Sequence, residues 1–77
     1  MKDKLMDILV SIRSDVDFVN EKTMIDDGIL ESFDVIQIVT AIMEEFDIFI
    51  DADDIEPENL NSFDAICSLV EKKISER

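Results

Sequence analysis

The spacing of apolar residues restricts the fold of this 77-residue chain more than any other feature of its sequence. In three separate segments, apolar residues recur three and four positions apart, which places them on one face of an α-helix. Only residues 47–51, DIFID, resemble a strand. No second strand is available to pair with them, and an isolated strand would leave its backbone groups without hydrogen bonds. The sequence therefore predicts an all-α fold.

A first helix is expected over about residues 3–13, where one apolar stripe consists of Leu5, Ile8, Leu9 and Ile12. Residues 14–31 lose this rhythm and mix acids with Asn20 and Gly28, so they are expected to form a long loop. We expect the loop to be held on the core by its scattered apolar side chains, which are Val16, Phe18, Val19, Met24, Ile25, Ile29 and Leu30.

A second helix is expected over about residues 32–47, and its core-facing stripe consists of Val35, Ile38, Val39, Ile42 and Phe46. Phe33, Ile36 and Met43 lie on a neighbouring arc that a single stripe does not explain. Either this helix is buried over a wide angle, or part of it is left for a partner.

The last third of the chain is expected to hold a short helical turn and a final helix. The turn is predicted over residues 53–56, ending near Pro57, with Leu60 as an apolar anchor. Asn61 or Ser62 can cap the final helix, whose stripe consists of Phe63, Ile66, Cys67, Val70 and Ile74. The predicted fold is a small four-helix bundle, with three main helices and one short helix in a single domain over residues 1–77.

The composition favours a cytoplasmic protein without a stable membrane insertion. The chain has one Cys, so no internal disulfide can form, which suits a reducing compartment. The opening MKDKLMDILV is a poor signal peptide, because an acid separates its lysines and no small-residue cleavage site follows. No apolar run approaches the length that spans a bilayer.

The charge of the chain is strongly negative, with 20 acidic and 7 basic residues and a net charge of -13. No Lys or Arg occurs between Lys22 and Lys72. A surface of this sign repels nucleic-acid phosphates and anionic lipids and attracts basic partners. The sequence therefore disfavours nucleic acid and membranes as partners.

The residue types also argue against an enzyme and against a metal site. The chain has no His and a single Cys, so neither a Ser-His-Asp triad nor a thiolate metal site can be assembled. Asp51 and Asp53 have the spacing of the first two ligands of a calcium loop, but Ile55 stands at the third and the required Gly is missing.

The candidate functional residue is Ser32, in the stretch DDGILESFD at positions 26–34. In the simplest interpretation Ser32 is a helix N-cap, since a Ser hydroxyl accepts a hydrogen bond from an amide of the first turn. Glu31 and Asp34 would complement the positive end of the helix.

The segment GILESFDVIQIVTAIMEEFDI, at residues 28–48, resembles the prosthetic-group segment of acyl carrier proteins. Their signature is Asp-Ser-Leu or Asp-Ser-Phe at the start of the second helix, and Glu31 stands here where the family usually has Asp. The resemblance extends over nearly the whole chain in length, helix order, acidity and the closing LNSFDAICSLV pattern.

The resemblance implies that Ser32 receives a 4'-phosphopantetheine arm from coenzyme A, attached by a separate phosphopantetheinyl transferase. The thiol of this arm would carry a cargo as a thioester between enzymes, with the protein acting as a monomer. GILESF is more similar to the Gly-Leu-Leu-Asp-Ser-Phe segment of D-alanyl carrier proteins than to that of fatty-acid carriers, which usually have Leu after the serine; Phe33 is the only local support. Fatty acyl, polyketide and aminoacyl cargoes are all compatible with the sequence.

The resemblance also implies a use for the apolar arc, because the second helix of carrier proteins docks on their partner enzymes. Those partners would be the basic-surfaced enzymes that load, condense or transfer the cargo. The opposing interpretation is that the arc thickens the core. The expected docking residues are Phe33, Ile36 and Met43, framed by Glu31, Asp34, Glu44 and Glu45.

An alternative function is an acidic interaction protein or inhibitor that occupies a basic cleft without a prosthetic group. The net charge alone permits it. It explains neither the segment from Gly28 to Ser32 nor the apolar arc, and it predicts no modification.

Overall fold

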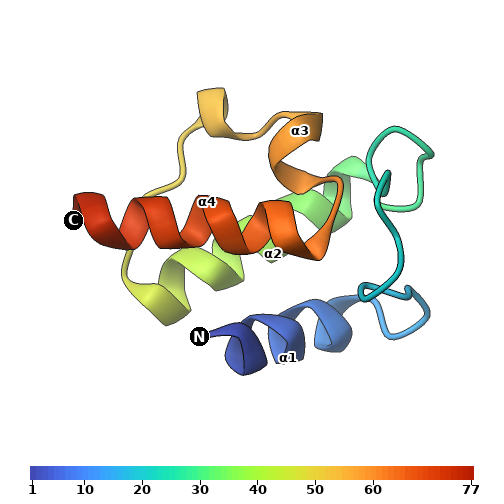
Figure 1. The fold of residues 1–77 in the computed structure, drawn as a ribbon, viewed down its shortest axis with the longest axis horizontal. Helices are drawn as coiled ribbons and strands as arrows, with labels where there is room; N and C mark the ends of the chain where they lie inside the picture. Colours follow the sequence, from blue (N-terminus) through green and yellow to red (C-terminus); the bar gives the residue numbers. More distant parts are fainter.

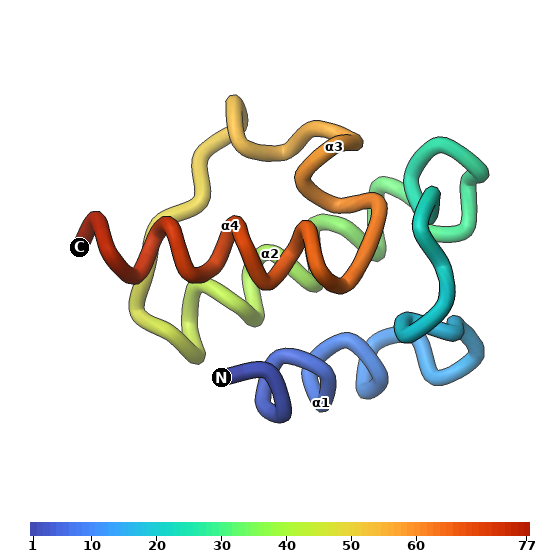
Figure 2. The backbone as a smooth tube through the Cα atoms, viewed as in Figure 1, coloured from blue at the N-terminus to red at the C-terminus, as the bar shows by residue number.

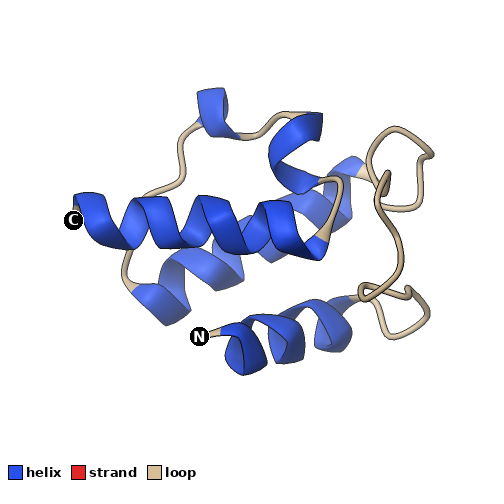
Figure 3. Ribbon diagram, in the orientation of Figure 1, coloured by secondary structure: helices blue, strands red, loops and turns tan.

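A computed structural model describes residues 1–77 and contains four α-helices and no strand (Figures 1 and 3). The all-α prediction and the small helical bundle are therefore confirmed. The radius of gyration is 11.2 Å, close to the value of about 11.5 Å expected for a compact chain of this length. The helices are α1 (Lys2–Ile12), α2 (Ser32–Phe46), α3 (Pro57–Leu60) and α4 (Phe63–Glu76).

The helices pack so that the long loop and the start of α2 lie at the same end of the molecule. Helix α1 packs against α2 and α4, and α3 packs against α4. The tube in Figure 2 shows the α1–α2 loop on the right, beside the first turn of α2, while both chain termini lie on the left. None of the four helices combines the length and the apolar character that crossing a bilayer requires.

The predicted stripes meet in one core of 15 buried apolar residues. Phe18, Met24 and Leu30 belong to this core, so the long loop is held by its own side chains as expected. The prediction was wrong for Val19, which is 67% exposed. Asp17 accepts the amide of Glu21 in a tight turn, and this turn directs Phe18 inward and its neighbour Val19 outward.

The short helical segments differ from the prediction. A 3-10 turn, η1, spans Ala52–Asp54 instead of residues 53–56, and Pro57 begins α3 rather than ending a helix. Proline suits the first helical position, because its φ is already helical and the amide it lacks would have no partner there. The side chain of Asp51 caps η1 by accepting from the amide of Asp53 at 3.0 Å.

Ser62 caps α4, whereas the side chain of Asn61 binds the backbone of the α1–α2 loop. The hydroxyl of Ser62 accepts from the amide of Ala65 at 3.1 Å. The side-chain oxygen of Asn61 accepts from the amides of Ile25 at 2.9 Å and Asp26 at 3.1 Å. The junction between α3 and α4 therefore holds the loop that leads to α2.

Candidate functional site

Ser32 is the first residue of α2, and its side chain is exposed. The N-cap is Glu31, whose extended backbone has φ -93 and ψ 167. The expectation that Ser32 caps the helix was therefore wrong: the chain enters the helix one residue earlier, so Ser32 is already helical. Ser62 shows the contrast, because its hydroxyl is occupied by capping α4, whereas the Ser32 hydroxyl is not used as a cap.

The first turn of α2 is closed by Asp34. Its Oδ2 accepts from the amide of Glu31 at 3.1 Å, and the first helical hydrogen bond runs from the amide of Val35 to the carbonyl of Glu31 at 3.0 Å. The amides of a first helical turn have no partner within the helix and lie at the positive end of its dipole. An anionic group on Ser32 would therefore lie at an end that favours negative charge.

Asp34 does not frame an exposed patch, contrary to the expectation from the sequence. It is the one buried charged residue of the chain, 8% exposed. Its Oδ2 accepts from Nη1 of Arg13 at 2.6 Å. Burying a carboxylate is costly unless it is paired and hydrogen-bonded, and Arg13 supplies the pair.

The other expected docking residues divide into exposed and half-buried side chains. Phe33 is 69% and Ile36 61% exposed, so these two side chains do not thicken the core. Met43 packs partly against the core. The remaining acids, Glu31, Glu44 and Glu45, are exposed, and Glu45 pairs with Lys4 at 3.2 Å.

A groove of about 760 Å³ lies beside Ser32, between the first turns of α2 and the segment from Ile55 to Leu60. Ser32, Phe33 and Ile36 line it from α2. Two acids and no basic residue line it: Glu31 and Glu56. The pKa of Glu56 is raised, chiefly because it shares a hydrogen bond with the neighbouring carboxyl of Glu58. The groove is therefore lined mainly by apolar side chains, and the only ionisable groups that line it are carboxyls.

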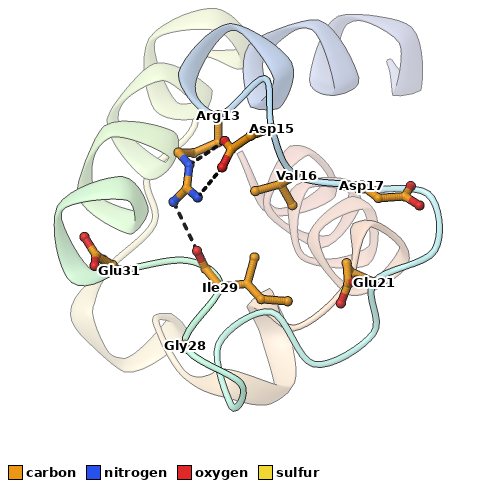
Figure 4. Close-up of a pocket in the computed structure, with 8 residues that line it drawn as sticks. All are labelled: Arg13, Asp15, Val16, Asp17, Glu21, Gly28, Ile29 and Glu31. Carbon is orange, nitrogen blue, oxygen red and sulfur yellow. Dashed lines mark hydrogen bonds and ion pairs between the residues drawn. The ribbon is translucent and has the colours of Figure 1, made fainter.

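A second, polar hollow of about 630 Å³ lies between the two ends of the α1–α2 loop, beside Arg13 (Figure 4). Nε and Nη2 of Arg13 donate to the two carboxylate oxygens of Asp15, each at 2.9 Å. These hydrogen bonds lower the pKa of Asp15 to about 2. Figure 4 also shows the bond from Nη1 of Arg13 to the carbonyl of Ile29, 3.0 Å long.

Sequence reasoning missed Arg13, Asn61 and Ile55 around this site. Ile55 is 40% exposed and faces the same groove as Phe33 and Ile36. A signal for Arg13 was present: a cation at the C-terminal end of one helix and an acid in the first turn of the next each suit their helix dipole. That signal does not reveal that the two side chains meet.

Three comparisons with known proteins end without a match: no family model, no curated protein and no solved structure matches this chain. The chemistry of the site therefore has to be inferred from its own residues and from the resemblance in residues 28–48.

Proposed function

We propose that the protein is a carrier that holds an acyl or aminoacyl group as a thioester on a 4'-phosphopantetheine arm attached to Ser32. The observation that carries the proposal is the position of this serine. It is exposed and is the first residue of α2, and it is not the N-cap, because that position belongs to Glu31. A hydroxyl in this position is accessible to a separate modifying enzyme.

The residues around Ser32 fit a phosphodiester. The amides of the first turn and the positive end of α2 offset part of its negative charge. Glu31 and Glu56 bring further negative charge to the same face, so a partner with a basic rim is favoured. When bound, the arm supplies the thiol that carries the cargo; this chain supplies the attachment point and no nucleophile for the transfer. Tethering then raises the effective concentration of the cargo at the partner.

The exposed apolar pair Phe33 and Ile36 is proposed as the docking contact for the phosphopantetheinyl transferase and for the loading and transfer enzymes. A small apolar centre with a charged rim suits transient binding. The carrier is proposed to act as a monomer in the cytoplasm, which fits its single, buried and unpaired Cys67.

The first test is the mass of the protein after incubation with a broad-specificity phosphopantetheinyl transferase and coenzyme A. The wild-type chain is expected to gain one phosphopantetheine, Ser32→Ala none, and Ser68→Ala, at an exposed serine on α4, the full gain. A gain that survives in Ser32→Ala would refute the site. If the wild type gains no mass in this incubation, and stays unmodified in cells that hold its own transferase, the carrier proposal is wrong. The acidic interaction protein then becomes the favoured function.

A second test separates docking from packing at the apolar arc. Ile36→Ser removes an exposed side chain and should change the free energy of unfolding by less than about 0.5 kcal/mol while it slows modification. Met43→Ser, at a half-buried site, should destabilise the fold instead. Unchanged modification of a folded Ile36→Ser protein would remove Ile36 from the docking contact.

A further inference from the structure

One side chain, Arg13, joins three segments that meet at the start of α2. Its Nη1 donates to Oδ2 of Asp34 at 2.6 Å and to the carbonyl of Ile29 at 3.0 Å. Ile29 lies three residues before Ser32 and Asp34 two residues after it. The same nitrogen therefore holds the chain on both sides of the serine.

The carboxylate of Asp34 accepts hydrogen bonds from two donors. Oδ2 of Asp34 accepts from Nη1 of Arg13 and also from the amide of Glu31 at 3.1 Å. This second bond closes the turn that contains Ser32. Arg13 is the only cation that pairs with Asp34, so the turn, the loop and the end of α1 are connected through a single guanidinium group.

Asp15 holds the guanidinium group of Arg13 in its orientation. Its Nε and Nη2 donate to both oxygens of Asp15 at 2.9 Å, as Figure 4 shows. The four hydrogen bonds reach three acceptor groups, and the pair to Asp15 uses the planar fork of arginine, whereas the ammonium of lysine is a point charge on a flexible stem. A lysine at position 13 would keep the charge, but its side chain is one bond shorter, so its nitrogen would fall short of the place from which Nη1 contacts both Ile29 and Asp34.

We propose that Arg13 is a positioning residue for Ser32, and that its contacts with Ile29 and Asp34 fix the direction in which the serine hydroxyl is presented to the modifying enzyme. This inference rests on the proposed function and adds a residue to it. Group transfer is sensitive to the placement of the attacking oxygen, and a shift of about 1 Å can cost about a hundredfold in rate. Arg13 is half-buried and does not line the groove with Phe33 and Ile36. Its loss should therefore lower the turnover of the transferase more than it weakens docking.

The test compares the rates at which the transferase modifies the full-length wild type and Arg13→Lys. The variant is expected to show a kcat lower by about tenfold or more, with a KM for the carrier within about twofold to threefold of the wild type. Asp34→Asn keeps the shape of the acceptor without its charge and should give an intermediate kcat. It also decides the question if Arg13→Lys does not fold.

Two control variants separate positioning from general damage. Asp17→Asn removes the charge of a loop carboxylate that accepts only from Asn20 and does not contact Arg13, and it should be modified at nearly the wild-type rate. Lys73→Gln breaks another half-buried ion pair, in which Nζ lies 2.8 Å from Asp54, near the C-terminal end of α4. It should lose stability without losing kcat.

The outcomes distinguish this inference from the function it rests on. A wild-type chain that takes no arm overturns both. A modified wild type beside an equally fast, folded Arg13→Lys overturns only the positioning role. The same holds if Lys73→Gln loses as much kcat as Arg13→Lys, or if the Arg13→Lys defect lies wholly in KM.

Discussion

Replacing Asn61 with Ala should release the loop that leads to Ser32, and the structure allows the cost to be worked out. The side-chain oxygen of Asn61 accepts from the amides of Ile25 and Asp26, at 2.9 and 3.1 Å. Its Nδ2 donates to Oδ2 of Asp26 at 3.1 Å. The bond from the amide of Met24 to the backbone carbonyl of Asn61, 3.0 Å long, survives the substitution.

The two lost hydrogen bonds from the amides of Ile25 and Asp26 determine the expected loss of stability. An intramolecular hydrogen bond contributes about 0.5–1.5 kcal/mol net, and a buried amide left without a partner costs more than one that water can reach. Ile25 is half-buried and Asp26 is exposed, so the first bond should be the stronger contributor. Together they predict a loss of about 1.5–2 kcal/mol in the free energy of unfolding. For a domain of this size the melting temperature should fall by about 6–16 °C.

Urea unfolding of the wild type and Asn61→Ala, followed by helical circular dichroism, measures this loss. Asn59→Ala is the matched control, since Asn59 makes one side-chain bond, to the carbonyl of Asp54 at 2.9 Å. The control should lose less than about 1 kcal/mol. If Asn61→Ala loses no more than Asn59→Ala, the side chain of Asn61 does not hold the loop and the reasoning is wrong.

Three further predictions concern charge and backbone strain. The hydrogen bond from Lys73 lowers the pKa of Asp54 from 3.8, so Asp54 contributes stability above its unfolded pKa that is lost as pH falls through the lowered value. The stability deficit of Asp54→Asn, measured by urea unfolding, should therefore shrink as the pH falls below about 5; a deficit that stays constant would contradict this prediction. Asp47 ends α2 in the left-handed region, at φ 53, so Asp47→Gly should stabilise the fold by about 0.5–1 kcal/mol in the same assay. With a net charge of -13, the melting temperature should rise from about 0.01 M to about 0.15 M NaCl, and a flat response would show that the carboxylates lie too far apart to repel.

The main helices could be predicted from the sequence because each buries one regular stripe. The expected ranges 3–13 and 32–47 differ by about one residue from Lys2–Ile12 and Ser32–Phe46. The short elements could not be assigned in the same way. Proline is compatible both with the end of one helix and with the start of the next, so the sequence around Pro57 did not distinguish between them.

The site could be predicted only in part, because its decisive contacts are not local. Glu31 and Asp34 are both acids that flank Ser32, and nothing nearby in the sequence separates their roles. Arg13, 21 residues before Asp34, decides that Asp34 is buried while Glu31 stays exposed. Likewise Asn61 binds amides 35 and 36 residues earlier in the chain, and local capping rules cannot reveal such a partner.

The geometry of the loop gives a reason why a carrier would need these distant contacts. A swinging arm delivers its cargo efficiently only if its attachment point is fixed, since the mobility of the attachment adds to that of the arm and dilutes the cargo. Ser32 follows the long loop of residues 13–31, and a loop of this length is more mobile when fewer contacts hold it. Asn61 holds this loop from the α3–α4 junction, and Arg13 holds it from the end of α1. Because the two contacts hold different residues of the loop and come from different helices, neither can replace the other, and the direction of Ser32 depends on how these helices pack.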